Sequence, residues 1–412
     1  KKTEMVFPTV LRIIMVAGVF AFLQAFVVPA LVQSKLAGFQ PGTPVEVSAA
    51  AQKVHQDLLV VDLHADSLFV NRDLLKRADM GCTWYYCSRS HVDVPRMLEG
   101  NLALQVFTVF AQIPVTFSFE SNSNSTLHDV LNFVVPLSGW PLNSWFSLKQ
   151  RALYQARKLA DFSARSEGRL RIIKTKQDLE QYISDRSACS GKSGGCDFTA
   201  GLLGIEGAHA LDGEVVNMNE MFDSGFRLVG LQHFFDNDFG GSMHGESKHG
   251  LTEKGKALVL RMEKLGIAVD LAHSSEAVMD DVLDIVTKPL FVSHSGARAT
   301  CNNNRTLTDH HIRRVCGLGG VIGAGFWDGA VCGNTVKDIV VTMKHIIKVG
   351  GIECVGLGSD WDGAVKVPAG LDAAGLSQIT QALLELDIPK HYIAAIMGGN
   401  ALRVFAATLP SA

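Results

Sequence analysis

The sequence lacks an excess of charge of either sign. Its 38 basic and 41 acidic side chains give a formal net charge of −3 over 412 residues. A protein that binds nucleic acid needs a basic surface to attract the phosphate backbone. The charge balance therefore excludes nucleic acid as an expected partner. Internal repeats and low-complexity tracts are also absent, and the length alone allows one large domain or two to three ordinary ones.

The eight cysteines lack the C-x2-C spacing that is typical of structural zinc sites. Cys82 and Cys87 are five positions apart and Cys189 and Cys196 are seven apart, both pairs among Gly, Ser and Tyr. Such pairs are typical of disulfides that close short loops in exported proteins. A zinc site with four cysteine ligands is the alternative interpretation.

Residues 13–32 form a long apolar run whose only polar side chain is Gln24. A helix of this length spans roughly 30 Å, the thickness of the hydrocarbon layer of a membrane. The run therefore predicts one transmembrane helix. A cleaved signal peptide is the alternative, although the run is longer than the usual apolar region of such peptides and no clear A-x-A cleavage site follows it.

The basic residues beside this run predict its orientation. Lys1, Lys2 and Arg12 lie on its N-terminal side, which keeps residues 1–12 in the cytoplasm and exports the rest of the chain. Residues 33–50 contain Gly and Pro without periodicity and predict a linker. The folded part is expected at 51–412, either anchored or, after cleavage of a signal peptide, free outside the cytoplasm.

Short apolar segments rich in β-branched residues recur along the folded part, separated by helical patterns. Most of them end in a polar, often ionisable, side chain. The eight segments are 58–66, 102–110, 202–209, 226–233, 266–273, 289–295, 319–326 and 354–360. Continuous apolar strands that alternate with helices predict a parallel sheet covered by helices, and eight of them predict a closed barrel. The expected fold is α/β, a (β/α)8 TIM-type barrel, with an insertion at about 111–200 where the alternation fails.

Ionisable side chains end six of the eight predicted strands. His64 and Asp66 form an H-x-D pair on one side of the first strand, because alternate residues of a strand point the same way. The others are Glu206, His233, His273, His294 and Asp360. The carboxyl ends of the strands meet at one mouth of a barrel, where so many buried ionisable groups are costly unless they pair or bind metal. Nitrogen and oxygen donors without thiolate predict zinc, cobalt or manganese, and their number favours two ions.

The remaining histidines lack this placement at strand ends. They lie in predicted loops or at polar helix starts, and most of them are expected to be solvated surface groups. They are His91, His244, His249, His310 and His311. His209 closes the third strand three residues after Glu206, and it either supports a metal ligand or packs in the core.

Six motifs resemble those of the membrane (renal) dipeptidases. They are DLHAD, GIEGAHAL, GLQHFFDND, VDLAHSS, FVSHSGARATCNNNR and GLGSDWDG, and they follow the family's order over about residues 55–405. The resemblance implies a zinc-dependent dipeptidase with two Zn²⁺ per chain. The metal ligands that it implies are His64, Asp66, Glu206, His273 and His294, with Glu206 bridging the two ions.

The resemblance also implies a mechanism and its catalytic residues. A hydroxide shared by the two ions on either side of Glu206 would attack the peptide carbonyl. Asp360 would carry a proton from the water to the leaving amine and contact the substrate, with Asp362 as the competing assignment. His233 would bind the substrate and donate a hydrogen bond to the oxyanion, and Arg305 would bind the substrate's carboxylate.

The sequence departs from the family's pattern in its cysteines and its anchoring. The resemblance implies a disulfide between Cys301 and Cys332, but Phe235 stands where the family has another cysteine, so no other bridge carries over. The chain shows no hydrophobic C-terminal tail, which leaves anchoring to the N-terminus and favours a bacterial enzyme of the inner membrane that faces the periplasm. A homodimer is implied by the resemblance alone.

Two other functions stay open from the sequence. A metal-dependent amidohydrolase acting on N-acyl amino acids or lactam rings could use the same barrel, because one fold hosts many chemistries. A catalytically silent barrel receptor is the second alternative. It is disfavoured because every expected ligand position holds a competent residue.

Overall fold

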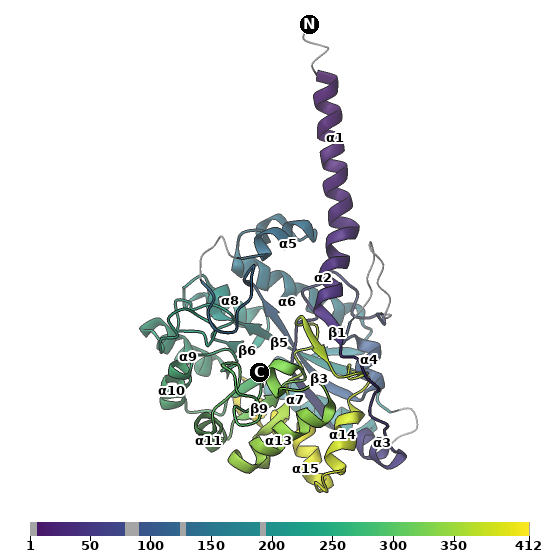
Figure 1. Ribbon diagram of the computed structural model, residues 1–412, viewed down its shortest axis with the longest axis vertical. Helices are drawn as coiled ribbons and strands as arrows, with labels where there is room; N and C mark the ends of the chain where they lie inside the picture. The colour runs from purple at the N-terminus through teal and green to yellow at the C-terminus, as the bar shows by residue number, and fades with distance from the viewer. Residues whose placement is uncertain (1–5, 79–89, 124–128, 190–194, 412) are drawn as a thin grey trace.

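The computed structural model describes residues 6–78, 90–123, 129–189 and 195–411. A closed ring of eight parallel strands lies at the centre of the molecule, with helices around it (Figure 1). Its strands are β2 (Val60–Ala65), β3 (Leu102–Phe110), β5 (Thr199–Glu206), β6 (Phe226–Gly230), β7 (Ala268–Asp270), β8 (Phe291–Ser295), β9 (Val321–Ala324) and β10 (Val355–Leu357). Pairing of β10 with β2 and of β3 with β5 closes the ring. The predicted TIM-type barrel is therefore confirmed.

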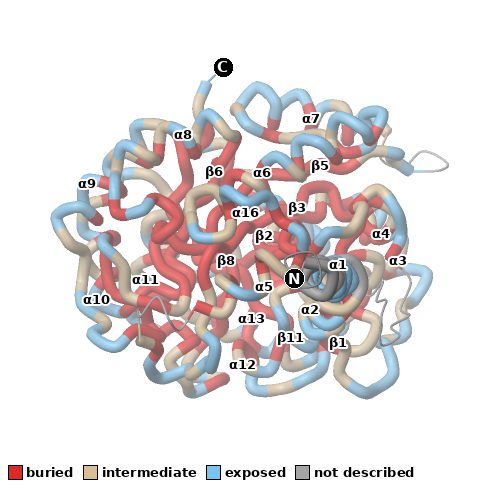
Figure 2. The backbone as a smooth tube through the Cα atoms, turned by 90° about the horizontal axis from the view of Figure 1, so that it is seen from above, coloured by how far each residue is buried: buried red, intermediate tan, exposed pale blue. Residues whose placement is uncertain are grey.

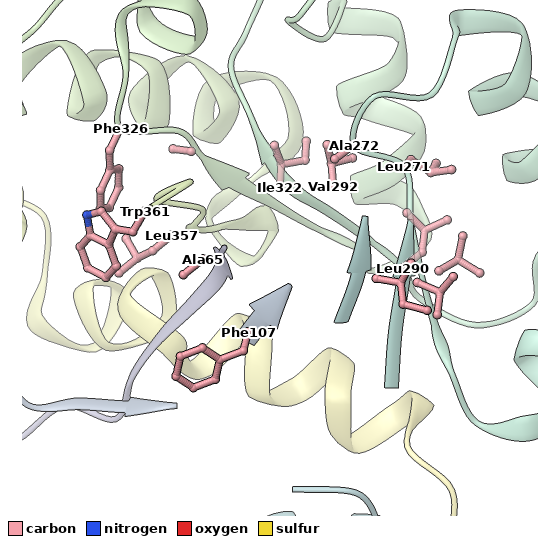
Figure 3. Packing of buried hydrophobic residues seen from close by; sticks show 14 of the residues in the cluster. Ala65, Phe107, Leu271, Ala272, Leu290, Val292, Ile322, Phe326, Leu357 and Trp361 are labelled. Carbon is pink, nitrogen blue, oxygen red and sulfur yellow. The ribbon is translucent and has the colours of Figure 1, made fainter. Parts of the chain in front are cut away.

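The barrel strands are buried along their whole length, as the red tube in Figure 2 shows. Their two faces contact the barrel interior and the surrounding helices, which explains why the sequence shows continuous apolar runs rather than alternation. Figure 3 shows this packing near the ends of several strands, including Phe107 of β3, Val292 of β8 and Leu357 of β10. The rigid core positions whatever side chains follow the strands.

Helices cover the outside of the barrel. They are α3 (Ala49–Gln56), α4 (Val94–Glu99), α8 (Asn217–Asp223), α9 (Glu253–Leu265), α10 (Glu276–Ile285), α11 (Asp309–Gly317), α12 (Asp328–Val331), α13 (Val336–Gly350), α14 (Ser377–Leu384), α15 (Lys390–Ala394) and α16 (Asn400–Thr408). Several have side-chain caps at their N-termini: Thr252 caps α9 and Ser275 caps α10. Gly266 ends α9 with a φ of 76°, the left-handed geometry that glycine adopts without strain.

The segment between β3 and β5 holds more structure than one crossover helix. It contains α5 (Leu131–Leu137), α6 (Leu148–Arg165), the short strand β4 (Leu170–Ile172) and α7 (Lys176–Cys189). The buried Arg151 of α6 donates to Asp129 at 2.7 Å and to the carbonyl of Ala111 at 2.8 Å. These bonds fasten the segment to the end of β3 and so to the mouth of the barrel.

The N-terminal region differs from the expectation. Its apolar run is divided among α1 (Val6–Phe22), a π-helical turn (Leu23–Val27) and α2 (Val28–Leu36). In Figure 1, α1 projects from the barrel, whereas α2 lies against α5 and β1. Among the described residues, no helix is both long and apolar enough to cross a membrane, so the predicted transmembrane helix over 13–32 is not supported. The expected linker also contains a strand, β1 (Ala37–Phe39), which pairs with β11 (Val365–Val367).

Three disulfides lie in the described residues. The predicted loop disulfide Cys189–Cys196 and the implied disulfide Cys301–Cys332 are both present. A third, Cys316–Cys354, joins the last turn of α11 to the residue before β10, and the sequence did not predict it. These six cysteines are therefore not free to form a four-cysteine zinc site, and disulfides are typical of proteins that fold in oxidising compartments. The predicted pair Cys82 and Cys87 lies outside the described residues.

The disulfide Cys316–Cys354 is expected to stabilise the barrel more than Cys189–Cys196 does. It closes a loop of 38 residues rather than 7, and longer closed loops restrict the unfolded chain more. Replacing both cysteines of each pair by serine should lower the free energy of unfolding by about 4 kcal/mol for the longer loop and about 2 kcal/mol for the shorter. Denaturant unfolding curves measure both losses. Equal losses would contradict the loop-length explanation.

Candidate metal centre

Seven ionisable side chains that the sequence predicts as site residues meet at the carboxyl end of the barrel. Three of them lie in strands, and four lie in the segments that directly follow strands. The first three are His64 of β2, Glu206 of β5 and His294 of β8; the other four are Asp66, His233, His273 and Asp360. All seven are buried. The barrel thus brings residues far apart in the sequence into one cluster.

The carboxylate of Glu206 lies at the centre of this cluster. Its Oε1 is 2.9 Å from His273 Nε2 and 3.2 Å from His294 Nε2, and its Oε2 is 3.3 Å from His233 Nε2. The Nε2 atoms of His273 and His294 are only 3.1 Å apart. Imidazole nitrogens that converge on one carboxylate in this way present their lone pairs to a common point.

A second group of ligand atoms surrounds His64. Its Nε2 lies 3.6 Å from Asp66 Oδ1, 3.6 Å from Glu206 Oε1 and 4.0 Å from Asp360 Oδ1. These distances are too long for hydrogen bonds, and this fully buried Nε2 has no hydrogen-bond partner among the described residues. A buried polar atom rarely stays without a partner, so its orientation toward three carboxylates points to a cation between them.

Two of the side chains reach the cluster through a strained backbone. His273 has a φ of 64° and Asp360 a φ of 59°, in the left-handed region that non-glycine residues seldom adopt. Such a conformation costs about 1–3 kcal/mol and is concentrated at functional sites. Both residues follow short strands, and the left-handed turn directs their side chains toward the barrel axis.

Ser293 fixes which nitrogen of two histidines carries a proton. Its hydroxyl donates to Asp270 Oδ2 at 2.5 Å, so its oxygen accepts from His294 Nδ1 at 2.9 Å and faces His64 Nδ1 at 3.3 Å. When each ring is neutral and carries its one proton on Nδ1, its Nε2 has a lone pair for a metal ion. Outer hydrogen bonds of this kind orient metal-binding histidines.

Asp62 joins the first and last strands of the barrel beneath the cluster. Its carboxylate accepts from Gln105 Nε2 at 2.6 Å and from Ser359 Oγ and N, both at 2.8 Å. Sequence reasoning missed this role, as it missed Asp270 and Ser293. The available signal was the presence of polar residues inside otherwise apolar strands, because a buried polar group needs partners.

The carboxylates of the cluster attract positive charge strongly. Burial alone would lower the pKa of His64, but the charges of Glu206, Asp66 and Asp360 outweigh it and raise that pKa to about 10. Burial also raises the pKa of Glu206 well above its usual value and that of Asp360 to about 7. A cation placed among these groups would relieve the repulsion between them.

The other imidazoles of the cluster are neutral. Burial, together with the charges of neighbouring basic groups, lowers the pKa values of His233, His273 and His294 well below the usual value. A neutral imidazole is the form that binds a metal ion, because protonation would occupy the lone pair.

Arg305 lies beside the cluster and is almost fully buried. Its Nη2 donates to the carbonyl of His294 at 2.8 Å and lies 3.3 Å from His273 Nε2. Its Nη1 has no hydrogen-bond partner in the part of the chain that the structure describes. The Arg305 guanidinium is therefore fixed through Nη2, and its Nη1 is available to a ligand.

Asp362 makes structural hydrogen bonds outside the cluster. Its carboxylate accepts from Ser67 Oγ and Arg72 Nη2, each at 2.6 Å, and from the His91 amide at 2.8 Å. Although burial opposes it, the charges of Arg72 and His91 and these hydrogen bonds hold the pKa of Asp362 below its usual value. This carboxylate fastens the loop after β10, and unlike Asp360 it does not line the cavity above the cluster, described below.

Three of the five histidines predicted at the surface are buried instead. His249 and His310 are exposed as expected, but the prediction is wrong for His91, His244 and His311. The reason is that His91 and His244 contact distant segments of the chain, and His311 lies on the buried face of α11, which local sequence cannot show. His209 is also buried, and neither of its ring nitrogens has a hydrogen-bond partner among the described residues, which favours packing over support of a ligand.

A cavity of about 480 Å³ opens above the cluster, a size typical of sites for small molecules. Six of the predicted functional residues line it: Asp66, Glu206, His233, His273, Arg305 and Asp360. His64 and His294 lie deeper in the cluster. The remaining lining is largely apolar and comes from other segments.

Residues 48–410 match the sequence profile of a family described as membrane dipeptidase (Peptidase family M19). The chain belongs to this family. The match covers every residue of the cluster, and it makes the chain a metallopeptidase of the hydrolase class. The membrane dipeptidase family thus accounts for the fold and for the six motifs.

Two sequence relatives agree with the assignment to the membrane dipeptidases, and a solved structure shares the fold. Two uncharacterized dipeptidases of Schizosaccharomyces pombe are 33% and 29% identical to this chain; each alignment covers 77% of it, and 72% and 73% of the two relatives. A metallo peptidase from Rhodobacter sphaeroides, solved with a phosphinate mimic of the dipeptide L-Ala-D-Ala, has a similar fold. Its TM-score is 0.66 at 22% identity, over 85% of this chain and 99% of that one.

The residues of this cluster fit divalent metal ions. Three overlapping groups of buried ligand atoms lie close enough to hold an ion: His64, Glu206 and His294; Glu206, His233 and His273; and His64, Asp66 and Asp360. All their donors are imidazole nitrogen or carboxylate oxygen, the set that suits zinc and similar ions. The buried, unpartnered Nε2 of His64 is the observation that tests this fit most directly.

Ser293→Ala should weaken metal binding by about 10- to 100-fold, because it removes the acceptor that orients His64 and His294. Competition with a chelator of known affinity measures this change. Ser144→Ala is the matched control, since Ser144 is also buried but donates to the carbonyl of Pro141 far from the cluster. Equal metal affinity in the two variants would remove Ser293 from the metal centre.

Proposed function

We propose that this protein hydrolyses dipeptides at a centre that holds two Zn²⁺ ions. The observation that carries the proposal is the position of Glu206, whose carboxylate belongs to two of the three ligand groups. A carboxylate shared between two groups suits a bridging ligand. His64 and Asp66 would hold one ion with Glu206, and His273 and His294 would hold the other with it.

Bound zinc ions would polarise the peptide carbonyl and lower the pKa of a water molecule. The protein's own residues would bind the substrate and move the protons. Asp360 is the proposed acid and base, because it lines the cavity and burial raises its pKa to about 7. A carboxyl group with a pKa near neutrality can accept a proton and return it to the leaving amine.

His233 is the proposed donor to the oxyanion. Its ring lies between Glu206 and Phe234, with the two ring centroids of His233 and Phe234 3.9 Å apart, and its Nδ1 has no hydrogen-bond partner among the described residues. With Glu206 and His273, it also forms one of the groups of ligand atoms that lie close enough to hold an ion. We assign His233 to substrate binding because five other residues already provide ligands for two ions. These are His64, Asp66, Glu206, His273 and His294.

Arg305 is the proposed binding site for the substrate's C-terminal carboxylate. Its unpartnered Nη1 and its place in the cavity wall support this role. The cavity also closes near the metal ligands, which favours short substrates. The dipeptide mimic bound by the Rhodobacter sphaeroides relative supports the same substrate class. N-acyl amino acids also carry a carboxylate that Arg305 could bind. The alternative amidohydrolase activity is therefore tested by assaying both substrate classes.

Arg305→Ala should raise KM for dipeptides and lower kcat/KM by about 10- to 1000-fold, because the charge-assisted bidentate contact is lost. The matched substrate is the same dipeptide with an amidated C-terminus, on which the wild type and the variant should differ little. Steady-state kinetics on both substrates measure the difference. An unchanged kcat/KM for the free dipeptide would remove Arg305 from the site, and faster turnover of N-acyl amino acids by the wild type would favour the alternative.

Asp360→Asn should lower kcat by about 100- to 10,000-fold while zinc content stays at two ions per chain, because the amide cannot exchange the proton. Elemental analysis and kinetics on the same preparation separate the two effects. Asp362→Asn is the comparison: it removes a structural contact, so its main effect should be on stability. The reverse pattern would assign the proton transfer to Asp362.

A further inference from the structure

The catalytic cavity has an aromatic wall that the metal ligands do not form. Phe117 and Phe119 come from the loop after β3, and Phe117 packs edge-on against both Phe119 and Phe234 with ring centroids 4.7 Å apart. All three line the cavity, and Phe117 and Phe119 remain about two-fifths exposed. Apolar rings that stay exposed inside a binding cavity favour an apolar group of the ligand.

Hydrogen bonds hold this loop in place. The Asn122 amide and its side-chain Nδ2 donate to the carbonyl of His244 at 2.8 and 3.0 Å. In return, His244 Nδ1 donates to the carbonyl of Phe119 at 2.9 Å. His244 is fully buried, and its ring lies 5.3 Å from that of His273. The aromatic wall is thus fastened to the segment next to the metal ligands.

A second wall of the cavity comes from the N-terminal region. Leu36 and Gln40 line the cavity on either side of β1, which lies beside β11 near the foot of α2 (Figure 1). The Ala364 amide donates to the carbonyl of Leu36 at 3.1 Å, and the Gln40 amide donates to Val367 at 2.7 Å. This segment precedes residue 48, where the family match begins. It is therefore an addition to the part of the chain that the family profile describes.

The two walls flank different halves of the metal centre. Phe234 stacks on His233, and its ring centroid lies 5.4 Å from that of His273, the residue that Arg305 Nη2 approaches. The other wall continues from the loop that carries Asp360. A methyl group added at Gly363 of that loop would lie 3.0 Å from Asp66 Oδ2. The aromatic wall is thus beside Arg305, and the β1 wall is beside Asp66 and Asp360.

We propose that these two walls select dipeptides with apolar side chains, one residue each. This inference rests on the proposed function, because it uses Arg305 as the site of the C-terminal carboxylate. The residue that carries this carboxylate lies beside Phe117 and Phe119, so the aromatic wall binds its side chain. Across the peptide bond, the N-terminal residue extends toward the loop that carries Asp360 and Gly363, so Leu36 and Gln40 contact its side chain.

The experiment compares kcat/KM for Gly-Gly, Gly-Phe and Leu-Gly in the zinc-loaded full chain. The wild type should prefer each apolar dipeptide over Gly-Gly by about tenfold or more, the scale of discrimination in an apolar pocket. Phe117→Ala should lower the preference for Gly-Phe about tenfold and leave that for Leu-Gly unchanged. Phe146→Ala is its control, since Phe146 is an exposed phenylalanine of the same region that does not line the cavity.

Variants of the β1 wall test the other position. Leu36→Asn should lower the preference for Leu-Gly alone. Gln40→Leu should raise the same preference, and such a gain cannot result from poor folding. Lys35→Ala is the control, because Lys35 is the exposed neighbour of Leu36 outside the cavity. Unchanged preferences in Phe117→Ala and Gln40→Leu, or effects at the opposite positions, would overturn the inference while dipeptide hydrolysis itself persists. A wild type that hydrolyses none of the three dipeptides would overturn the proposed function.

Discussion

The structure depends on one buried interaction, the carboxylate of Glu206 among imidazole nitrogens. A carboxylate at this depth pays a large desolvation cost unless positive charge lies nearby. His273, His294 and His233 approach it within 3.3 Å, yet burial keeps all three neutral. Neutral imidazoles cannot balance the carboxylates by themselves. The arrangement makes physical sense as a ligand set whose charge is balanced by metal ions.

The barrel provides the rigidity that such a cluster requires. The ligands come from the carboxyl ends of four strands or the residues just after them, so the closed hydrogen-bonded ring fixes their relative positions. Beneath them, Asp62 and Asp270 connect neighbouring strands through buried hydrogen bonds. The left-handed backbone conformations of His273 and Asp360 direct these two side chains toward the cluster. Their strain energy is offset by the packing of the surrounding core. The geometry of the site therefore lowers the stability of the fold.

The sequence predicted the barrel and the cluster because both leave local signals. Eight apolar runs indicate buried parallel strands, and an ionisable residue at the end of a buried strand, such as His64 or Glu206, is conspicuous. Other features depend on contacts between distant segments. The local sequence around His244 indicates an exposed loop residue. In the folded chain, the loop after β3 covers His244 and buries it. The pairing of β1 with β11 and the disulfide Cys316–Cys354 likewise join segments whose proximity only the folded chain shows.

The proposed function has Glu206 joining two zinc ions in a dipeptidase. The most direct test is a crystal structure of the purified protein with diffraction data collected on both sides of the zinc absorption edge. The account predicts two anomalous peaks, one on each side of the Glu206 carboxylate, with His64 and Asp66 at one and His273 and His294 at the other. A single peak, or peaks that do not touch Glu206, would contradict it.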